Sequence, residues 1–202
     1  MSRGPWPGDS RLYLITGVRP ELDGLIEAAV RGGVDIVQIR EKELLDGELL
    51  PVLQRVRELT RRLGVPFVIN DRPDLALLVE ADLVHVGQDD LPVEAARRLG
   101  LAVGLSTHSR QEIDRADADY IGVGPVYATP TKEGRPGVGL ELVGYAAEHA
   151  RAPWFSLGGI DAGNVADVVA AGAERIAVIR AIADAPDPER AAAEFRTALD
   201  RG

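Results

Sequence analysis

The sequence predicts a single compact (β/α)8 TIM barrel, in which a closed parallel sheet is surrounded by helices. Three observations lead to this fold class. Eight short apolar segments of strand length recur along the chain, segments with helical spacing of apolar residues separate them, and polar residues follow the apolar segments. Alternating strands and helices are typical of parallel sheets, and eight units of roughly 25 residues fit a small barrel. A doubly wound open sheet is the alternative, but nothing resembling GxGxxG follows the first expected strand.

Each expected element rests on a local pattern. The strands are rich in branched and apolar residues and are expected at 12–16, 36–40, 66–70, 82–86, 102–106, 120–124, 154–158 and 175–179. Helical spacing is seen at Leu22, Leu25, Ile26, Ala29 and Val30; at Leu49, Leu53, Val56 and Leu59; at Ala147 and Ala150; and at Val165, Val168 and Val169. The helices that follow Val93 and Ser109 are expected to be short, as a barrel of this size requires.

The composition limits the classes of protein to consider. With 202 residues, 46% of them apolar, the chain can bury one core, so we expect one domain over 1–202 with a flexible extension over 1–10. A chain without cysteine has no disulfide, thiolate ligand or cysteine nucleophile. The net charge of -9 argues against a nucleic-acid surface, and neither a membrane span nor a signal peptide is evident. We therefore expect a cytoplasmic protein with no nucleic-acid or membrane partner, and leave a homo-oligomer open.

Polar residues gather where the expected strands end, which is where barrel enzymes carry their chemistry. Gln38, Arg40 and Lys42 alternate along the second strand and its extension, so all three face the same side if the segment is extended. Two cations in a barrel mouth need an anionic partner, and an ion pair with Glu41 or Glu43 is the alternative. The other strand ends carry Asn70 and Asp71; His85, Gln88, Asp89 and Asp90; Ser106, Thr107 and His108; Thr129, Thr131 and Lys132; Gly158 and Gly159; and Arg180.

Two of these strand ends are candidate anion sites. Thr129 and Thr131 would direct their hydroxyls the same way in an extended loop, and Lys132 adds a positive charge beside them. The glycine stretch 158–160 precedes a helix expected to start near Asn164, so loop amides and a helix N-terminus could bind phosphate there, together with the end of strand eight. The alternatives are a polar surface turn and a tight strand-to-helix turn.

Two carboxylates are the candidate metal ligands. Asp71 and Asp90 follow neighbouring strands, and Mg²⁺ binds one or two carboxylates together with phosphate oxygens of a substrate. The alternative is that each one caps the next helix, because Pro73 and Pro92 follow closely.

No nucleophile and base stand together in this set of residues. We expect His85 to be a core histidine bonded to backbone, and His108 either to line the mouth or to serve in a helix cap. Positioning and electrostatic stabilisation of a leaving group therefore fit the mouth better than acid-base chemistry does.

These residues together resemble the thiamine phosphate synthase family, also called thiamine-phosphate pyrophosphorylase, from Leu12 to about Ala198. The motifs that carry the resemblance are QIREK at 38–42, IND at 69–71, HVGQDDLP at 85–92, GLSTHS at 104–109, GVGPVYATPTK at 122–132, GGI at 158–160 and VIRAI at 178–182. The resemblance implies a transferase of thiamine biosynthesis. It would couple 4-amino-5-hydroxymethyl-2-methylpyrimidine diphosphate with 4-methyl-5-(2-hydroxyethyl)thiazole phosphate by a dissociative, magnesium-assisted substitution, which gives thiamine monophosphate and diphosphate.

The family's residue roles carry over position by position. The resemblance implies that the pyrimidine diphosphate is bound by Gln38, Arg40, Lys42 and Asn70. It implies that Mg²⁺ is held by Asp71 and Asp90, and that the departing group is contacted by Ser106 and Lys132. Arg40, Lys42, Ser106 and Lys132 would thus be the catalytic set. The thiazole phosphate would be bound by Thr129, Thr131, Gly159, Ile179 and Arg180, and Arg180 departs from the serine that many members carry. Its guanidinium would either contact the phosphate through its forked donors or point away and leave the backbone to bind.

Two other functions compete with this one. A thiazole tautomerase with the same barrel would isomerise the thiazole precursor and would need a proton-transfer residue, for which His108 is the candidate. A non-catalytic barrel that binds phosphate ligands would show binding without turnover. Asp71 and Asp90 favour the synthase, because an isomerase that acts on a monophosphate has no need of a diphosphate-metal site.

The glycine and proline content of 128–137 motivates the further hypothesis that this loop closes over substrate.

Overall fold

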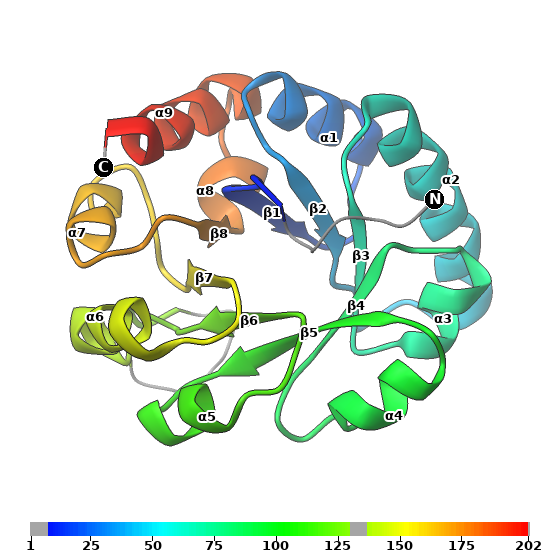
Figure 1. The fold of residues 1–202 in the computed structure, drawn as a ribbon. Coiled ribbons are helices and arrows are strands. Elements are labelled where there is room, and N and C mark those ends of the chain that lie inside the picture. The colour runs from blue at the N-terminus through cyan, green and yellow to red at the C-terminus, as the bar shows by residue number, and fades with distance from the viewer. Residues whose placement is uncertain (1–7, 130–136, 202) are drawn as a thin grey trace.

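The computed structural model describes residues 8–129 and 137–201, and it shows the expected closed barrel of eight parallel strands with helices outside it (Figure 1). Every expected strand is confirmed to within one residue at each end. The strands are β1 Leu12–Thr16, β2 Ile36–Ile39, β3 Phe67–Asn70, β4 Leu83–Val86, β5 Ala102–Thr107, β6 Tyr120–Val123, β7 Trp154–Leu157 and β8 Ile176–Val178. They pair in sequence order, and β8 closes the sheet against β1.

The helices lie on the outside of the sheet, and α1 to α7 connect successive strands. They are α1 Leu22–Arg31, α2 Asp46–Leu63, α3 Pro73–Leu78, α4 Val93–Arg98, α5 Arg110–Arg115, α6 Gly139–His149, α7 Val165–Ala170, α8 Arg180–Ala183 and α9 Pro188–Arg201. The short α4 and α5 confirm the expectation for those two connections. Two helices, α8 and α9, follow the last strand, where a (β/α)8 barrel requires only one. Thr131, Lys132 and most of the loop 128–137 lie outside the described residues, as do residues 1–7 of the expected extension.

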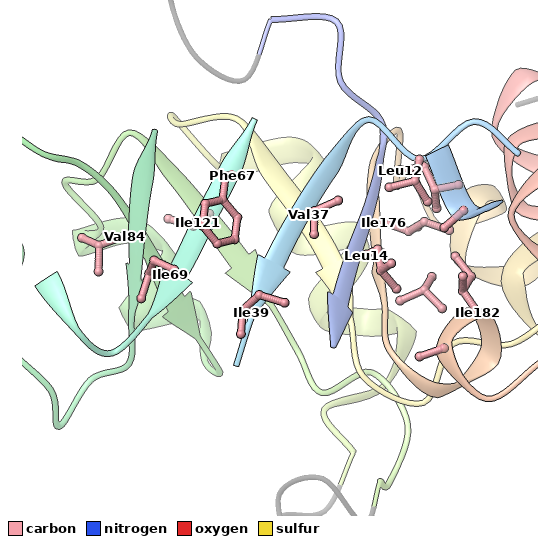
Figure 2. Close-up of a cluster of buried hydrophobic side chains, with 14 of the residues drawn as sticks. Leu12, Leu14, Val37, Ile39, Phe67, Ile69, Val84, Ile121, Ile176 and Ile182 are labelled. Atoms are coloured by element: carbon pink, nitrogen blue, oxygen red, sulfur yellow. The ribbon is translucent and has the colours of Figure 1, made fainter. Parts of the chain in front are cut away.

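The core has two layers because successive side chains of a strand point to opposite faces of the sheet. Leu12 and Leu14 pack outward against the helices, and Figure 2 shows part of this outer layer. Tyr13, which lies between them, points into the barrel. The residues that fill the barrel are Tyr13, Ile15, Ile36, Val68, Leu83, Tyr120, Phe155 and Ala177.

A buried ion pair lies outside the barrel where α2 meets the start of β3. The side chains of Arg57 and Asp82 are 7% and 14% exposed, and Arg57 Nη2 lies 3.2 Å from Asp82 Oδ1. Asp82 Oδ2 also accepts the backbone N–H of Phe67 at 2.9 Å, so this carboxylate joins α2 to β3.

Replacing Asp82 by alanine should lower the free energy of unfolding by about 3 kcal/mol, because the buried guanidinium of Arg57 then loses its counter-charge. Urea unfolding of the variant measures this loss. Glu27→Ala is the matched control, because Glu27 pairs with Arg62 at an exposed site where the side chains are 44% and 67% exposed. The control should change stability by less than about 0.5 kcal/mol, and equal losses in the two variants would contradict the prediction.

Candidate functional site

A pocket of about 580 Å³ opens at the carboxyl end of the barrel, and every strand or its extension contributes to its lining. Eleven of the thirteen residues expected in the site line this one pocket. They are Gln38, Arg40, Lys42, Asn70, Asp71, Asp90, Ser106, Thr129, Gly159, Ile179 and Arg180. The other two, Thr131 and Lys132, lie outside the described residues. The strand-end pattern therefore selected residues that the fold brings together from distant parts of the chain.

The apolar part of the pocket lining was not predicted from the sequence. Ile15, Pro125, Leu157 and Ala177 also line the pocket, and three of them belong to the inner face of the sheet. The alternation of side chains along each strand could have predicted this lining. Ile15, for example, lies two residues after the inward-facing Tyr13 and therefore also points inward. A mouth with an apolar wall and a polar rim suits a ring that carries charged groups.

The basic side of the pocket is formed just beyond β2. Arg40 and Lys42 both line the pocket, and Arg40 makes no ion pair with any residue in the ranges 8–129 and 137–201. The alternative, an ion pair of Arg40 or Lys42 with Glu41 or Glu43, is not found among the described residues. The Glu41 carboxylate instead accepts the backbone N–H groups of Val18, Lys42 and Glu43, at 3.0, 2.9 and 2.8 Å. Partial burial raises the pKa of Glu41, but these backbone donors outweigh it and the net pKa is lowered.

The acidic side lies across from these cations. Asp71 directly follows β3, with a left-handed φ of 61°, and its N–H donates to the carbonyl of His85 on β4 at 2.8 Å. Asp90 folds back over its own loop, where Oδ2 accepts the N–H of Gly87 at 2.7 Å. Neither carboxylate caps a helix: α3 and α4 have Arg72 and Pro92 at their N-caps, without side-chain caps. The capping alternative is therefore wrong for both residues.

The two carboxylates influence each other. Burial raises the pKa of Asp71, and a hydrogen bond and charge repulsion from Asp90 raise it further, while Lys42 and Arg40 act in the opposite direction. Lys42 Nζ lies 3.9 Å from Asp71 Oδ2. No cluster of three His, Cys, Asp or Glu side chains suited to a metal exists among the described residues. An adjacent carboxylate pair nevertheless fits Mg²⁺, which completes its shell with water and substrate phosphate oxygens.

The raised pKa of Asp71 leads to a prediction about stability. A carboxyl group whose pKa is higher in the folded state than in the unfolded state destabilises the fold once pH exceeds its ordinary pKa. Asp71→Asn should therefore be more stable than the parent at neutral pH, and the gain should disappear in acid, where Asp71 is protonated. Asparagine also tolerates the left-handed conformation. Thermal unfolding at several pH values measures this, with Asp89→Asn as the control of equal charge change. A destabilised Asp71→Asn variant at neutral pH would contradict it.

The two histidines of the mouth have different partners. His85 is a core residue, as expected, and its ring bonds to two side chains: Nδ1 lies 2.8 Å from Tyr120 Oη, and Nε2 lies 2.9 Å from Ser106 Oγ. His108 lines the pocket, and its Nδ1 is hydrogen-bonded to the carbonyl of Gly124. Its backbone N–H donates to the Glu112 carboxylate at the start of α5, so His108 both lines the mouth and belongs to a helix start.

A glycine turn after β7 forms another wall of the pocket, apart from the cations that follow β2. Gly158 and Gly159 have φ values of 98° and 69°, which favour glycine. The turn is held at both ends: Tyr127 N–H donates to the Gly158 carbonyl at 3.0 Å, and the Asn164 side chain donates to the Gly159 carbonyl at 2.9 Å. The helix that follows begins only at Val165. The helix that begins at the pocket wall is α8, which starts at the pocket residue Arg180.

Solved structures similar to this chain include a thiamine phosphate pyrophosphorylase from Pyrococcus furiosus. It is 32% identical in sequence, has a TM-score of 0.86, and the match covers 96% of each chain. A 3-hexulose-6-phosphate synthase from Salmonella typhimurium, at 19% identity and a TM-score of 0.72, shares the fold alone.

Sequence relatives cover nearly the whole chain. The thiamine-phosphate synthase of Thermus thermophilus is 50% identical over 94% of this chain and 97% of its own length. That of Gloeobacter violaceus is 51% identical over 96% of this chain, which spans only 58% of that longer protein. The family model described as thiamine monophosphate synthase matches residues 12–182. The chain therefore belongs to the thiamine monophosphate synthase family.

Proposed function

We propose that this chain is a thiamine-phosphate synthase. It couples the aminopyrimidine diphosphate with the thiazole phosphate and releases thiamine monophosphate and diphosphate. The observation that carries the proposal is that one pocket holds a carboxylate pair, two cations and a glycine turn. Such a pocket offers one region for a diphosphate with its metal and a second for a monophosphate.

The residues on the β2 and β3 side act on the pyrimidine diphosphate. Arg40 and Lys42 attract the diphosphate and stabilise the negative charge that grows on it as the carbon–oxygen bond breaks. Gln38 and Asn70 hold the substrate in place, and Ser106 donates a hydrogen bond to the departing group. Lys132 belongs to the same catalytic set by resemblance.

Asp71 and Asp90 would hold Mg²⁺ against the diphosphate. The bound cation would neutralise part of the charge on the departing group, as divalent cations do in phosphate-transfer sites. The support for this assignment is the proximity of two carboxylates that neither cap a helix nor pair fully with the nearby cations.

The opposite side binds the thiazole phosphate. Thr129, Gly159, Ile179 and Arg180 line this part of the pocket, and Thr131 joins them by resemblance. The exposed Arg180 replaces the serine that many members carry, and its guanidinium brings forked donors that match a phosphate. The thiazole nitrogen then attacks the pyrimidine cation, and this attack requires no protein base.

We also propose that the enzyme acts in the cytoplasm, either as a monomer or as a homo-oligomer. Among the described residues, no helix has both the length and the apolar character that a membrane crossing needs. The expected absence of a nucleic-acid partner rests on the net charge of -9.

Product formation tests the proposal. Purified protein is given both substrates, with Mg²⁺ or with excess chelator, and thiamine monophosphate and diphosphate are quantified. Equal amounts of both products, formed only with the metal, are expected. Isomerisation of the thiazole precursor without coupling would favour the tautomerase, and binding of either phosphate without any turnover would favour the non-catalytic barrel.

A further inference from the structure

A chain of hydrogen bonds crosses the barrel interior beneath the pocket and joins β2 to β5. Gln38 Nε2 lies 2.6 Å from Tyr13 Oη, which lies 3.0 Å from Tyr120 Oη. Tyr120 Oη lies 2.8 Å from His85 Nδ1, and His85 Nε2 lies 2.9 Å from Ser106 Oγ. None of the five residues is more than 8% exposed. The two ends of the chain, Gln38 and Ser106, are both pocket residues.

The packing around this chain leaves its members little freedom. The rings of Tyr13 and Tyr120 each meet the ring of Phe155 edge-on, with centroids 5.4 and 5.7 Å apart. Gly104 provides the space for Tyr120, because a Cβ at that position would lie 2.1 Å from the tyrosine ring. The hydroxyl groups are therefore held in line by a close-packed core.

Gln38 determines which atom donates in each hydrogen bond of this chain. The amide nitrogen of Gln38 can only donate, so Tyr13 Oη accepts from it and passes its own single proton to Tyr120. Tyr120 in turn donates to His85 Nδ1, which must then be the unprotonated ring nitrogen. His85 consequently carries its proton on Nε2 and donates to Ser106 Oγ. Burial raises the pKa of both tyrosines, so each keeps the proton that the chain needs.

We propose that Tyr13, Tyr120 and His85 are positioning residues. They determine that Gln38 presents a hydrogen-bond acceptor to the pocket and that Ser106 presents a donor. Their chain leaves the carbonyl oxygen of Gln38 as an acceptor and the hydroxyl proton of Ser106 as a donor. A matching ligand carries an N–H donor on one side and an oxyanion on the other. Only the identity of this ligand rests on the proposed function. In the pyrimidine diphosphate, the amino group of the ring is the N–H donor and the diphosphate is the oxyanion.

The tautomer of His85 in the ligand-free protein tests the proposal directly. Nitrogen-15 NMR distinguishes a neutral histidine protonated on Nε2 from one protonated on Nδ1. The protein has three histidines, and a His85→Asn variant identifies the signals of His85. In mildly alkaline buffer we expect the Nε2–H form. In the Gln38→Glu variant under the same conditions, the new carboxylate can only accept, so Tyr13 must donate to it and His85 should change to the Nδ1–H form.

A matched control and a kinetic measurement complete the test. Thr107→Val is the control, because the buried Thr107 hydroxyl donates to the Gly122 carbonyl and takes no part in the hydrogen-bond chain. In this variant His85 should keep the Nε2–H form, and the KM should equal that of the parent protein. Tyr13→Phe should raise the KM for the pyrimidine substrate roughly tenfold, the equivalent of one lost hydrogen bond.

Three results would overturn the proposal. They are an Nδ1–H histidine in the parent protein, an unchanged tautomer in Gln38→Glu, and an unchanged KM in Tyr13→Phe. The tautomer measurements need no turnover. Failure of the proposed function, which would appear as folded protein without product, is therefore distinguishable from failure of this inference.

Discussion

Asp71→Ala and Asp90→Ala should each lower kcat by about 10²–10³-fold, the usual effect of removing one group that stabilises charge in a transition state. Each carboxylate is proposed to hold the metal that neutralises the departing diphosphate. Stability should change much less, because neither carboxylate caps a helix. Alanine at the left-handed φ of 61° in Asp71→Ala should cost about 1 kcal/mol. Steady-state kinetics with saturating substrates and thermal unfolding of the same samples measure both effects.

Asp89→Ala is the control, because Asp89 lines the same pocket and is adjacent to Asp90 in sequence. It should keep kcat within about threefold, because Asp90 and not Asp89 is the carboxylate that acts on Asp71. Titration with Mg²⁺ separates metal binding from other roles, and both alanine variants should require far more metal for half-maximal rate. Either variant with full activity at limiting Mg²⁺ would remove that residue from the metal site.

The strands and the pocket residues were predictable because they depend on short-range patterns. An apolar segment of four or five residues followed by a polar one marks both a buried strand and its end. Eight such ends must meet at one face once the sheet closes. Arg40 and Asp90 could therefore be assigned to one mouth from the sequence alone.

The partners within the barrel were not predictable in this way. His85 reaches Ser106 because β4 pairs with β5 in the register that sets His85 beside Gly104. A shift of one residue would direct the ring to the opposite face of the sheet. Alternation shows that Tyr13 and Tyr120 point inward, but not that their hydroxyl groups meet, because β1 and β6 are not neighbours in the sheet. The register and the closure of the barrel decide these contacts.

Gly158→Ala should lower the free energy of unfolding by about 3 kcal/mol, because backbone strain and overpacking add. The residue has a φ of 98°, and a Cβ there would lie 2.4 Å from Cα of Pro125. Pro125 is fixed in its turn, because its carbonyl accepts the N–H of Val138 at 2.8 Å. Relief of the clash must therefore move the glycine turn itself, so the KM for the thiazole phosphate should rise at least tenfold, by about 1.4 kcal/mol of binding.

Gly24→Ala is the matched control for this substitution. Gly24 lies on the exposed side of α1, and a Cβ there would meet nothing within 4 Å, so alanine should stabilise the protein by about 0.5–1 kcal/mol. Urea unfolding of both variants, followed by kinetics with each substrate varied in turn, distinguishes a local effect from general damage. A rise in KM confined to the thiazole phosphate identifies the turn as its binding wall, because the cations and carboxylates of the other wall are untouched. An equal rise for the pyrimidine diphosphate would mean that Pro125 transmits the strain across the mouth, and would contradict the assignment of separate walls to the two substrates.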